Sequence, residues 1–255
     1  MLPTYERLDA PKTLIKIAFS KLAIGAISLA LGAFLFTIFW TLMFDFERAT
    51  YTHCDVRNYL PSISAAIGNY EPQKSVWRLA IILHLPIRLA VSHIYSKYYR
   101  DHIRKNRRIF AHTAVTLNVI ENFALLSLSL WTSSDNYEMH RNSFVTFIAC
   151  SELYMLITYF LHKNGRKLQL TALEEKSVRF KLYLFLTNLV AFAMAGYFFL
   201  RHNAKCEPGG NLYLFALFEY IVVFSNMGYH MTAYWDFFGV NICFDWENGL
   251  YLSHL

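Results

Sequence analysis

Long apolar blocks separated by shorter polar segments form the main pattern of this chain. The first block, Leu22 to Phe44, runs for 23 residues without a charged side chain. About 20 apolar residues are enough to cross the hydrocarbon core of a bilayer as a helix. Five further blocks follow, so the pattern predicts an all-α, polytopic bundle of six transmembrane helices. The predicted spans are 22–44, 76–97, 110–131, 143–161, 182–200 and 212–235.

Composition supports this interpretation over a soluble helical bundle. The chain has 255 residues, 55% of them hydrophobic and 16% charged, whereas soluble domains carry about 25% charged residues. The first block exceeds the apolar core of a signal peptide, and no small-residue cleavage site follows it, so we expect it to be retained. We expect residues 1–255 to form a single membrane domain.

Lysine and arginine predict the orientation. Segments 1–21, 97–109, 162–181 and 236–255 together hold 16 of them, and the alternate segments 45–75, 132–142 and 201–211 hold 6. Positive loops face the cytosol, so both termini are predicted to be cytosolic and 45–75 luminal. The basic stretch 97–108 would lie on anionic lipid. This accounts for the net charge of +6 with a lipid bilayer, and no nucleic acid, as the partner.

The luminal loop 45–75 is more apolar than a free loop requires, and Pro61 and Gly68 interrupt it. Two interpretations remain open. It is an interfacial or re-entrant segment, or it is a folded cap over the helix ends.

Cysteine placement predicts a disulfide. On this topology Cys54 and Cys206 share the luminal compartment, which is oxidising, so they are expected to pair. His53 and His202 lie near them, and two cysteines with two histidines could bind zinc. This alternative is weaker because the spacing matches no established zinc pattern, so no metal is expected.

Polar residues interrupt the predicted spans. At 100° per residue, Glu219, Asn226 and His230 share one face of the last span. Asp236 is expected at the cytosolic edge, extending toward water. The other spans contribute a further set: His84 and Arg88 around Pro86, then Asn118, Glu121 and Asn122, and finally Glu152.

Depth along the predicted helices separates these groups. We expect Arg78, His84 and Glu219 in the luminal half, near Arg201 and His202. Arg88, Glu121 and Glu152 should lie at mid-depth, and Asn226 and His230 in the cytosolic half. Buried charges in a bilayer need partners. They are either ion pairs that join helices, such as Arg88–Glu121, or the lining of a functional polar cavity.

Familiar catalytic motifs are missing from the sequence. There is no Gly-x-Ser-x-Gly elbow, no His-Glu-x-x-His helix and no P-loop. An enzyme built on this chain would therefore use an uncommon arrangement. A transporter that uses the intramembrane charges is a further alternative, although no half-helix repeat is seen.

Four segments nevertheless form a specific combination. They are "THCDVRNYLPSISAAIG" (52–68), the His84/Arg88 pair, "NVIENFALL" (118–126) and "RHNAKCEPGGNLYLFALFEYIVVFSNMGYHMTAYWDF" (201–237). In these segments the chain resembles the post-GPI-attachment-to-proteins factor 2 family, which belongs with the Frag1/DRAM/Sfk1-type six-helix membrane proteins. The tail from Gly239 onward shows no pattern that we can match.

The resemblance implies lipid remodelling of glycosylphosphatidylinositol (GPI) anchors, mainly in the Golgi membrane, with the endoplasmic reticulum membrane as the alternative. The expected partners are GPI-anchored proteins and GPI lipid. The family supports reacylation of the lyso-GPI form with a saturated, stearoyl-type chain at sn-2. No cofactor is implied, and acyl-CoA or phospholipid would be the acyl donor. The alternative is a non-catalytic protein that presents or scrambles lipid, or an adaptor for a separate acyltransferase.

An acyl transfer needs a base and a group that stabilises the oxyanion. We expect His84 to be the base, Arg78 or Arg88 to hold a phosphate or the oxyanion, and Glu219 to orient a histidine or pair an arginine. His230 is expected to lie too close to the cytosol unless acyl-CoA enters from that side. The remaining candidates for substrate binding are Glu121, Asn122, Asn226, Arg201, His202 and His53.

Overall fold

The computed structural model describes residues 14–52, 54, 56–68, 70–206, 211–247 and 249–254. Six of its helices are long and apolar enough to cross a membrane, which confirms the predicted spans. They extend past the predicted ends because their polar terminal turns are also helical. They are α1 (Phe19–Phe44), α4 (Gln73–His102), α5 (Arg108–Leu130), α6 (Tyr137–Asn164), α7 (Ala172–Lys205) and α8 (Asn211–Met231).

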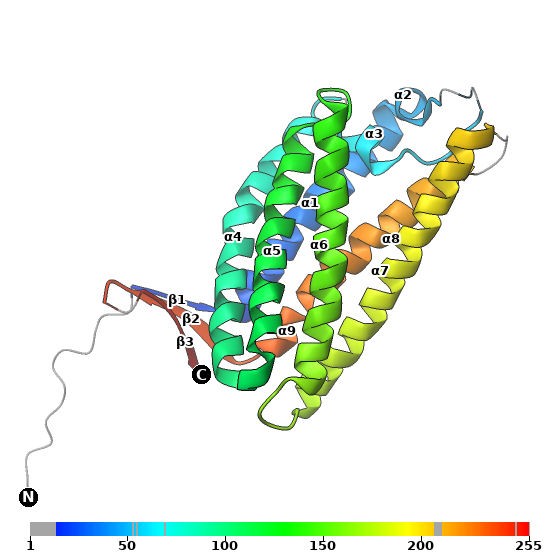
Figure 1. Cartoon of the computed structure of the whole chain (residues 1–255). Helices are drawn as coiled ribbons and strands as arrows, with labels where there is room; N and C mark the ends of the chain where they lie inside the picture. The colour runs from blue at the N-terminus through cyan, green and yellow to red at the C-terminus, as the bar shows by residue number, and fades with distance from the viewer. Residues whose placement is uncertain are drawn as a thin grey trace, which may run out of the picture.

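These helices stand in two rows of three. Helices α4, α5 and α6 form one row, and α1, α8 and α7 form the row behind it (Figure 1). The closest neighbours are α7 with α8, α5 with α6, α4 with α5, and α1 with α4, whereas α6 and α7 pack much less closely. The first row therefore closes on the second through α1 and α4, and is looser on the opposite edge.

Small residues allow α1 to approach its neighbours. Ala23, Ala26, Ala30 and Ala33 are buried on one face of this helix. In membranes such faces permit close backbone packing, because lipid provides little hydrophobic drive between helices. Large apolar side chains instead point outward from all six helices, which suits a surface in contact with lipid.

The segment that was predicted as a luminal loop is a folded cap. We use this name for residues 45–72, which contain the short helices α2 (Phe46–Thr50) and α3 (Ile63–Gly68). Ala66 is fully buried, and its carbonyl accepts a hydrogen bond of 3.0 Å from the Thr41 hydroxyl of α1. Of the two alternatives for this segment, the structure shows the cap. We call this end of the bundle the cap end.

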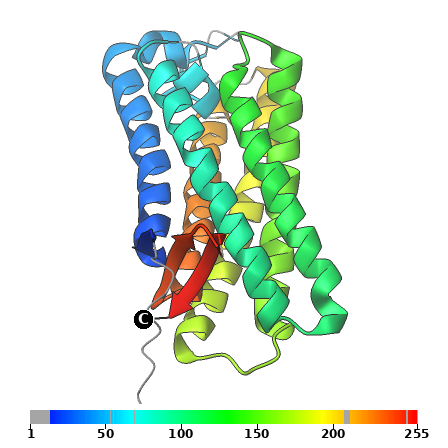
Figure 2. The ribbon, with the colours of Figure 1, turned by 90° about the vertical axis from the view of Figure 1, so that its left-hand side faces the viewer.

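A three-stranded antiparallel sheet lies at the opposite end, which we call the sheet end (Figure 2). Strand β1 (Ile15–Ala18) pairs with β2 (Val240–Asp245), and β2 pairs with β3 (Gly249–His254). Gly249 begins β3 with φ of 62°, a conformation that glycine adopts without strain. The sheet was not predicted, because the tail was read as a segment without a pattern.

A short helix connects the bundle to this sheet: α9 (Ala233–Asp236) lies between α8 and β2. Elsewhere, the 3₁₀ turn η1 (Lys105–Arg107) lies between α4 and α5. Aromatic rings fill the junction: Phe19 of α1 lies 4.4 Å from Phe237 between ring centroids, and Tyr95 of α4 lies 4.9 Å from it. The sheet is thereby held against α1 and α4.

Candidate functional site

A buried group of charged and amide side chains joins α4, α5 and α8. We call Arg88, Asn118, Glu121, Asn226 and His230 the central cluster. The carboxylate of Glu121 is fully buried, and its Oε1 lies 3.2 Å from Arg88 Nη2 and 2.9 Å from His230 Nε2. The Arg88–Glu121 ion pair therefore exists, and it carries a histidine as a third member.

Amide groups complete the coordination of this carboxylate. Asn118 Nδ2 donates to Glu121 Oε2 at 3.0 Å, and Asn226 Nδ2 lies 3.4 Å from Oε1. Asn226 also donates to the Ser151 hydroxyl of α6 at 2.6 Å. Asn122, a further predicted residue, donates to Asn118 Oδ1 at 3.4 Å. The Glu121 carboxylate thus connects α4, α5 and α8, and Asn226 extends the network to α6.

Two contacts of His230 require opposite protonation states of its Nε2. Its Nε2 lies 2.9 Å from Glu121 Oε1 and 3.0 Å from Arg88 Nη2. A proton on Nε2 favours the carboxylate, and its absence lets Nε2 accept from the guanidinium. Tyr154 stacks on the imidazole with a centroid distance of 5.4 Å and fixes the ring plane. Proton position and hydrogen bonding are therefore coupled at this residue.

His84 lies beside the central cluster without joining its hydrogen bonds. It sits one turn before Arg88 on α4, which continues as a helix through Pro86, and only 3% of its surface is exposed. Its electrostatic neighbours include Arg88, Glu121 and His230. Its Nε2 has no hydrogen-bond partner among the described residues. A buried polar atom of this kind is uncommon and calls for an explanation.

The depths predicted for these residues need a correction. Asn226 and His230 were placed in the cytosolic half and Arg88 with Glu121 at mid-depth, but all four form one cluster. Counting residues along separate helices fails here because the helix ends were uncertain by a turn, and because a long arginine side chain spans a further turn.

Glu219 has a different role from the one expected. Its Oε2 accepts a hydrogen bond of 3.1 Å from the backbone N–H of Ile63, the first residue of α3. The first N–H groups of a helix lack partners within it, so they attract a carboxylate. No arginine or histidine pairs with Glu219 in the part of the chain that the structure describes. Among the described residues, this side chain therefore anchors the cap and does not make the expected pairing.

Arg78 holds the turn between α5 and α6. Its guanidinium lies 2.8 Å from Asp135 Oδ2 and donates to the carbonyls of Ser129 and Leu130 at 3.2 and 2.6 Å. Lys74 Nζ lies 3.0 Å from the same carboxylate. Hydrogen bonds from Lys74, and then Thr132, lower the pKa of Asp135 to about 2. Nε and Nη2 of Arg78 thus hold the loop, whereas Arg88 lies beside His84 and is the better placed candidate for an oxyanion.

The predicted disulfide is confirmed. Cys54 and Cys206 are bonded with Cα atoms 5.4 Å apart. Because the bond uses both sulfurs, they cannot serve as thiolate ligands for zinc. His202 is buried at the end of α7 with Nε2 3.7 Å from Cys54 Sγ, and Arg201 donates to the Tyr197 hydroxyl at 3.1 Å. His53 lies outside the described residues.

A second buried cluster lies near the sheet end, and sequence reasoning missed it. Asp236 Oδ2 lies 2.6 Å from Lys181 Nζ and accepts from the Tyr95 hydroxyl at 2.7 Å. Its Oδ1 accepts from the Ser177 hydroxyl at 2.6 Å and lies 3.7 Å from His162 Nδ1. We call these five residues the sheet-end cluster. The expectation that Asp236 extends toward water is wrong, because a lysine in the first turns of α7 supplies its counter-charge.

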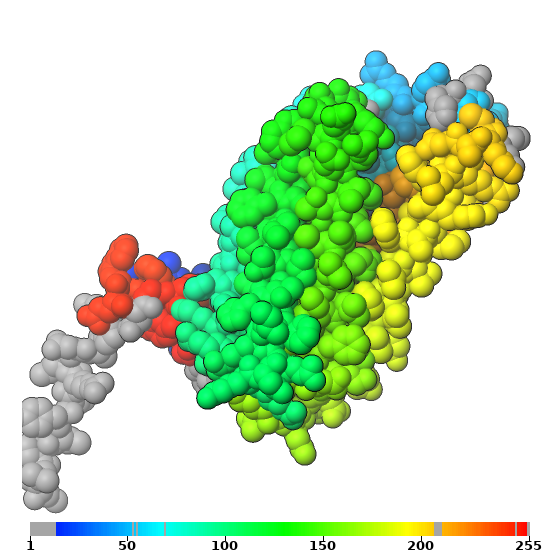
Figure 3. Space-filling view, in the orientation of Figure 1, coloured from blue at the N-terminus to red at the C-terminus, as the bar shows by residue number. Residues whose placement is uncertain are grey.

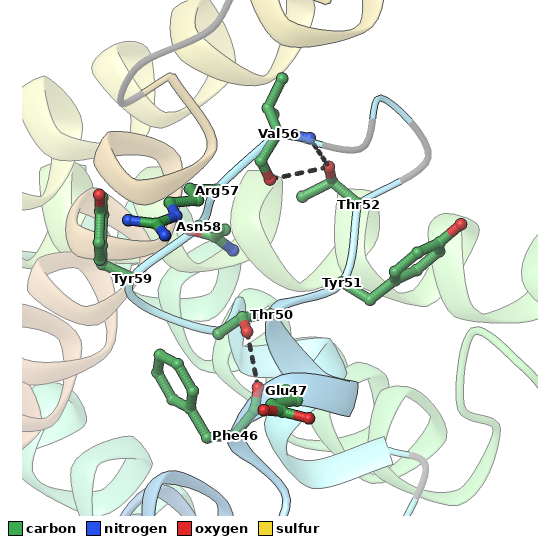
Figure 4. A pocket seen from close by; sticks show the side chains of 9 residues that line it. All are labelled: Phe46, Glu47, Thr50, Tyr51, Thr52, Val56, Arg57, Asn58 and Tyr59. Atoms are coloured by element: carbon green, nitrogen blue, oxygen red, sulfur yellow. Dashed lines mark hydrogen bonds between the residues drawn. The ribbon is translucent and has the colours of Figure 1, made fainter.

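The cap contains a pocket of about 400 Å³. Figure 4 shows its lining, in which Arg57 and Asn58 lie close to the exposed ring of Tyr59, whereas the exposed ring of Tyr51 lies on the opposite side; Glu47 also lines the pocket. Hydrogen bonds from Thr50 to the Phe46 carbonyl and between Thr52 and Val56 hold the backbone around it. This pocket offers polar groups and aromatic faces at the cap end.

The surface is also hollowed between α6 and α7. In Figure 3 the hollow lies in the half toward the cap, with α8 at its floor. The apolar side chains at this seam come from all three helices and include Phe144, Ile148, Phe192 and Phe218. The looser edge of the bundle therefore presents an apolar face between two spanning helices.

Comparisons with known proteins point to one family. The profile of the Frag1/DRAM/Sfk1/Cwh43P N-terminal domain matches residues 18–240. The chain is 61% identical to post-GPI attachment to proteins factor 2 of Drosophila melanogaster over 99% of both chains. It is 42% identical to a Xenopus tropicalis protein named acyltransferase PGAP2, over 88% of this chain and 90% of that one. No solved structure matches it.

Proposed function

Since this chain belongs to the Frag1/DRAM/Sfk1 family, we propose that it remodels the lipid of GPI-anchored proteins as an acyltransferase. The names of its relatives support a role after GPI attachment, and two of them are named acyltransferases. In this proposal the acceptor is a lyso-GPI-anchored protein, and a saturated, stearoyl-type chain is added at sn-2. The protein works as a multi-pass protein of the Golgi membrane, or of the endoplasmic reticulum membrane.

The chemistry is the attack of a lipid hydroxyl on the carbonyl of an acyl donor. His84 takes the hydroxyl proton as the new C–O bond forms, and Arg88 stabilises the oxyanion. Collapse of the tetrahedral intermediate breaks the donor's thioester or ester bond, and the proton passes to the leaving thiolate or alkoxide. General base catalysis of this kind contributes typically 10²–10⁴-fold in rate.

The observation that carries the proposal is the free Nε2 of His84 beside Arg88. A base must be able to accept a proton, and no hydrogen bond from the described residues occupies this atom. Arg88 is held by Glu121 and His230, so its guanidinium is already oriented. Groups that are oriented before the reaction stabilise developing charge without reorganising.

The acceptor would approach from the cap end if the predicted orientation holds. In this arrangement its headgroup contacts the cap pocket of Tyr51, Asn58 and neighbouring residues. Its hydrocarbon chains lie in the hollow between α6 and α7. In this proposal Glu121, Asn122, Asn226 and His230 contribute to binding the lipid part of the acceptor, and Arg201 and His202 contribute to binding its headgroup.

A second candidate function is a non-catalytic one, in which the protein presents or scrambles lipid or serves a separate acyltransferase. The apolar hollow between α6 and α7 favours it, because an apolar surface of this kind can bind a lipid chain without any chemistry. In that case the central cluster joins helices, and His84 only packs beside it.

Reconstitution separates the two functions. Purified protein in liposomes is given a lyso-GPI-anchored acceptor and labelled stearoyl-CoA or stearoyl phospholipid. Transfer by the wild type, with loss in His84→Asn and retention in His162→Asn, supports the enzyme. His162 is a matched control because it is also a buried histidine of the bundle. Absence of label from protein that still restores remodelling in deficient cells would exclude the acyltransferase.

A further inference from the structure

A basic pocket lies between α4 and α5 at the sheet end, on the opposite side of the molecule from the cap. Its volume is about 370 Å³. Helix α4 contributes His93, Lys97 and Arg100, and α5 contributes Arg108 and His112. These spacings of three and four residues place the side chains on one face of each helix. No aspartate or glutamate lines this pocket.

The lysine and arginine side chains of this pocket keep most of their positive charge unpaired by the residues that line it. Lys97 Nζ donates to the carbonyl of Leu250, and Arg108 Nη2 donates to the carbonyl of Arg100 at 3.2 Å. The buried Nε of Arg108 has no partner among the described residues. Only Arg100 pairs with a described carboxylate, that of Asp101 at 3.6 Å, and both side chains are well exposed. Neutral carbonyls fix the cations in place and leave their charge available.

Apolar groups border the same pocket. Ala111 and Val115 line it on α5, beside the ring of Tyr99. Next to Arg108, the side chains of Ile109 and Phe110 are 68% and 45% exposed. Exposed apolar residues on a spanning helix face lipid. The pocket therefore lies where a charged edge meets the apolar surface of the bundle.

We propose that this basic pocket binds the phosphate group of an amphipathic ligand whose acyl chain runs along α5. Arginine and lysine bind phosphate through charge-assisted hydrogen bonds. Basic clusters next to a transmembrane helix recognise phosphorylated lipid headgroups. Two sources carry this chemistry: an anionic phospholipid of the surrounding leaflet, and an acyl-CoA. The site does not depend on the proposed acyl transfer, since occupancy requires only the pocket.

Binding to full-length protein in nanodiscs tests the proposal. The probe is fluorescent phosphatidylinositol 4-phosphate in a phosphatidylcholine bilayer, and stearoyl-CoA is the competitor. We expect Arg100→Gln/Arg108→Gln to weaken probe binding by about tenfold or more, the loss of one strong contact. The matched control is Arg104→Gln/Lys105→Gln, which removes the same charge from the adjacent turn outside the pocket and should change binding less than about threefold.

Each outcome of this binding experiment either supports or overturns the proposal. Displacement by stearoyl-CoA at lower concentration than by unlabelled phosphoinositide identifies the CoA ester as the ligand, and the reverse order identifies the phospholipid. Equal losses in the pocket and control variants mean that general surface charge attracts the probe, and they overturn the proposal. So does equal binding of phosphatidylcholine and phosphoinositide by the wild type. If the double pocket variant fails to fold, Arg100→Gln and His112→Gln are measured singly by the same criteria.

Discussion

The central cluster and the sheet-end cluster contain the same kinds of charged residue but differ in geometry. Each contains one buried carboxylate, one cation and one histidine. In the sheet-end cluster the contacts of Asp236 with Lys181, Tyr95 and Ser177 measure 2.6 to 2.7 Å, and His162 lies farther away, at 3.7 Å. Around Glu121 the contacts measure 2.9 to 3.4 Å, and Nε2 of His84 beside them has no partner in the part of the chain that the structure describes.

This difference separates two uses of buried charge in one bundle. Short contacts from Lys181, Tyr95 and Ser177 fix the Asp236 carboxylate in place. The central cluster, by contrast, has a histidine nitrogen shared between Glu121 and Arg88, and beside it lies His84, whose Nε2 has no hydrogen-bond partner among the described residues. The first arrangement suits structure, and the second suits chemistry.

The largest expected effect comes from breaking the sheet-end cluster. Asp236→Asn leaves the Lys181 ammonium buried without a counter-charge, which costs about 3–5 kcal/mol of stability. The loss is measured by thermal unfolding of the purified protein, with size-exclusion chromatography used to monitor how much folded protein remains. The control is Asp236→Leu/Lys181→Met, which removes both charges and should recover most of the stability. An unchanged melting temperature for Asp236→Asn would contradict a structural role.

Replacing the histidine beside the central cluster and the histidine of the sheet-end cluster sharpens the comparison on activity. His84→Asn should lower acyl transfer by about 10²-fold or more, the usual share of a general base, with little change in melting temperature. His162→Asn should lower stability more than activity per folded molecule, because His162 neighbours the Asp236 carboxylate. The measurement is stearoyl transfer per mole of folded protein. Equal activities of the two variants would remove the functional distinction between the clusters.

A smaller effect is expected at Glu219, a carboxylate that belongs to neither cluster. Glu219→Leu leaves the backbone N–H of Ile63 without its acceptor, which costs about 1–3 kcal/mol. The cap should then loosen, and hydrogen exchange at residues 63–68 should accelerate. Glu219→Gln keeps an acceptor oxygen and should remain close to the wild type. Slow exchange in the leucine variant would show that the cap does not depend on this bond.

The smallest effect is expected at Asp135, an exposed carboxylate that serves as a comparison for the buried carboxylates of the two clusters. Its pKa is lowered from 3.8 to about 2, so its ionised form contributes stability above the unfolded pKa. That contribution is lost as the pH falls through about 2. The difference in melting temperature between wild type and Asp135→Asn should stay constant from about pH 7 to pH 5 and shrink below about pH 4. A difference that changes near neutral pH would contradict the lowered pKa.

Much of the fold could be predicted because its signals are local. Each spanning helix appears as an apolar block, and the block from Leu22 to Phe44 needs no partner to be recognised. The disulfide followed from compartments: once the spans are known, Cys54 and Cys206 fall on one side. The sheet could not be predicted, because Val240–Asp245 is short and its partner Ile15–Ala18 lies at the far end of the chain.

Arg88, Glu121 and His230 were all predicted from the sequence, and so was the Arg88–Glu121 ion pair. The contacts of His230 with both residues were not predicted, because residue counting put His230 at another depth. Lys181 was missed because it fell in a segment read as a loop, 162–181, where a lysine needs no explanation. Contacts between helices depend on tilt and side-chain length, which a single sequence does not encode in its spacing.

The pairing of β1 with β2 has a consequence for how the protein is made. Strand β1 precedes the six spanning helices in the sequence, whereas its partner Val240–Asp245 follows all of them, so the two strands can pair only after the six helices have been synthesised. Closing so long a loop carries an entropic cost that only the assembled helices can offset. Pairing of β1 with β2 therefore requires that all the intervening helices have been made and assembled. A chain that stops before Val240 exposes Ile15–Ala18 as an unpaired strand edge, the kind of surface that other chains and chaperones bind.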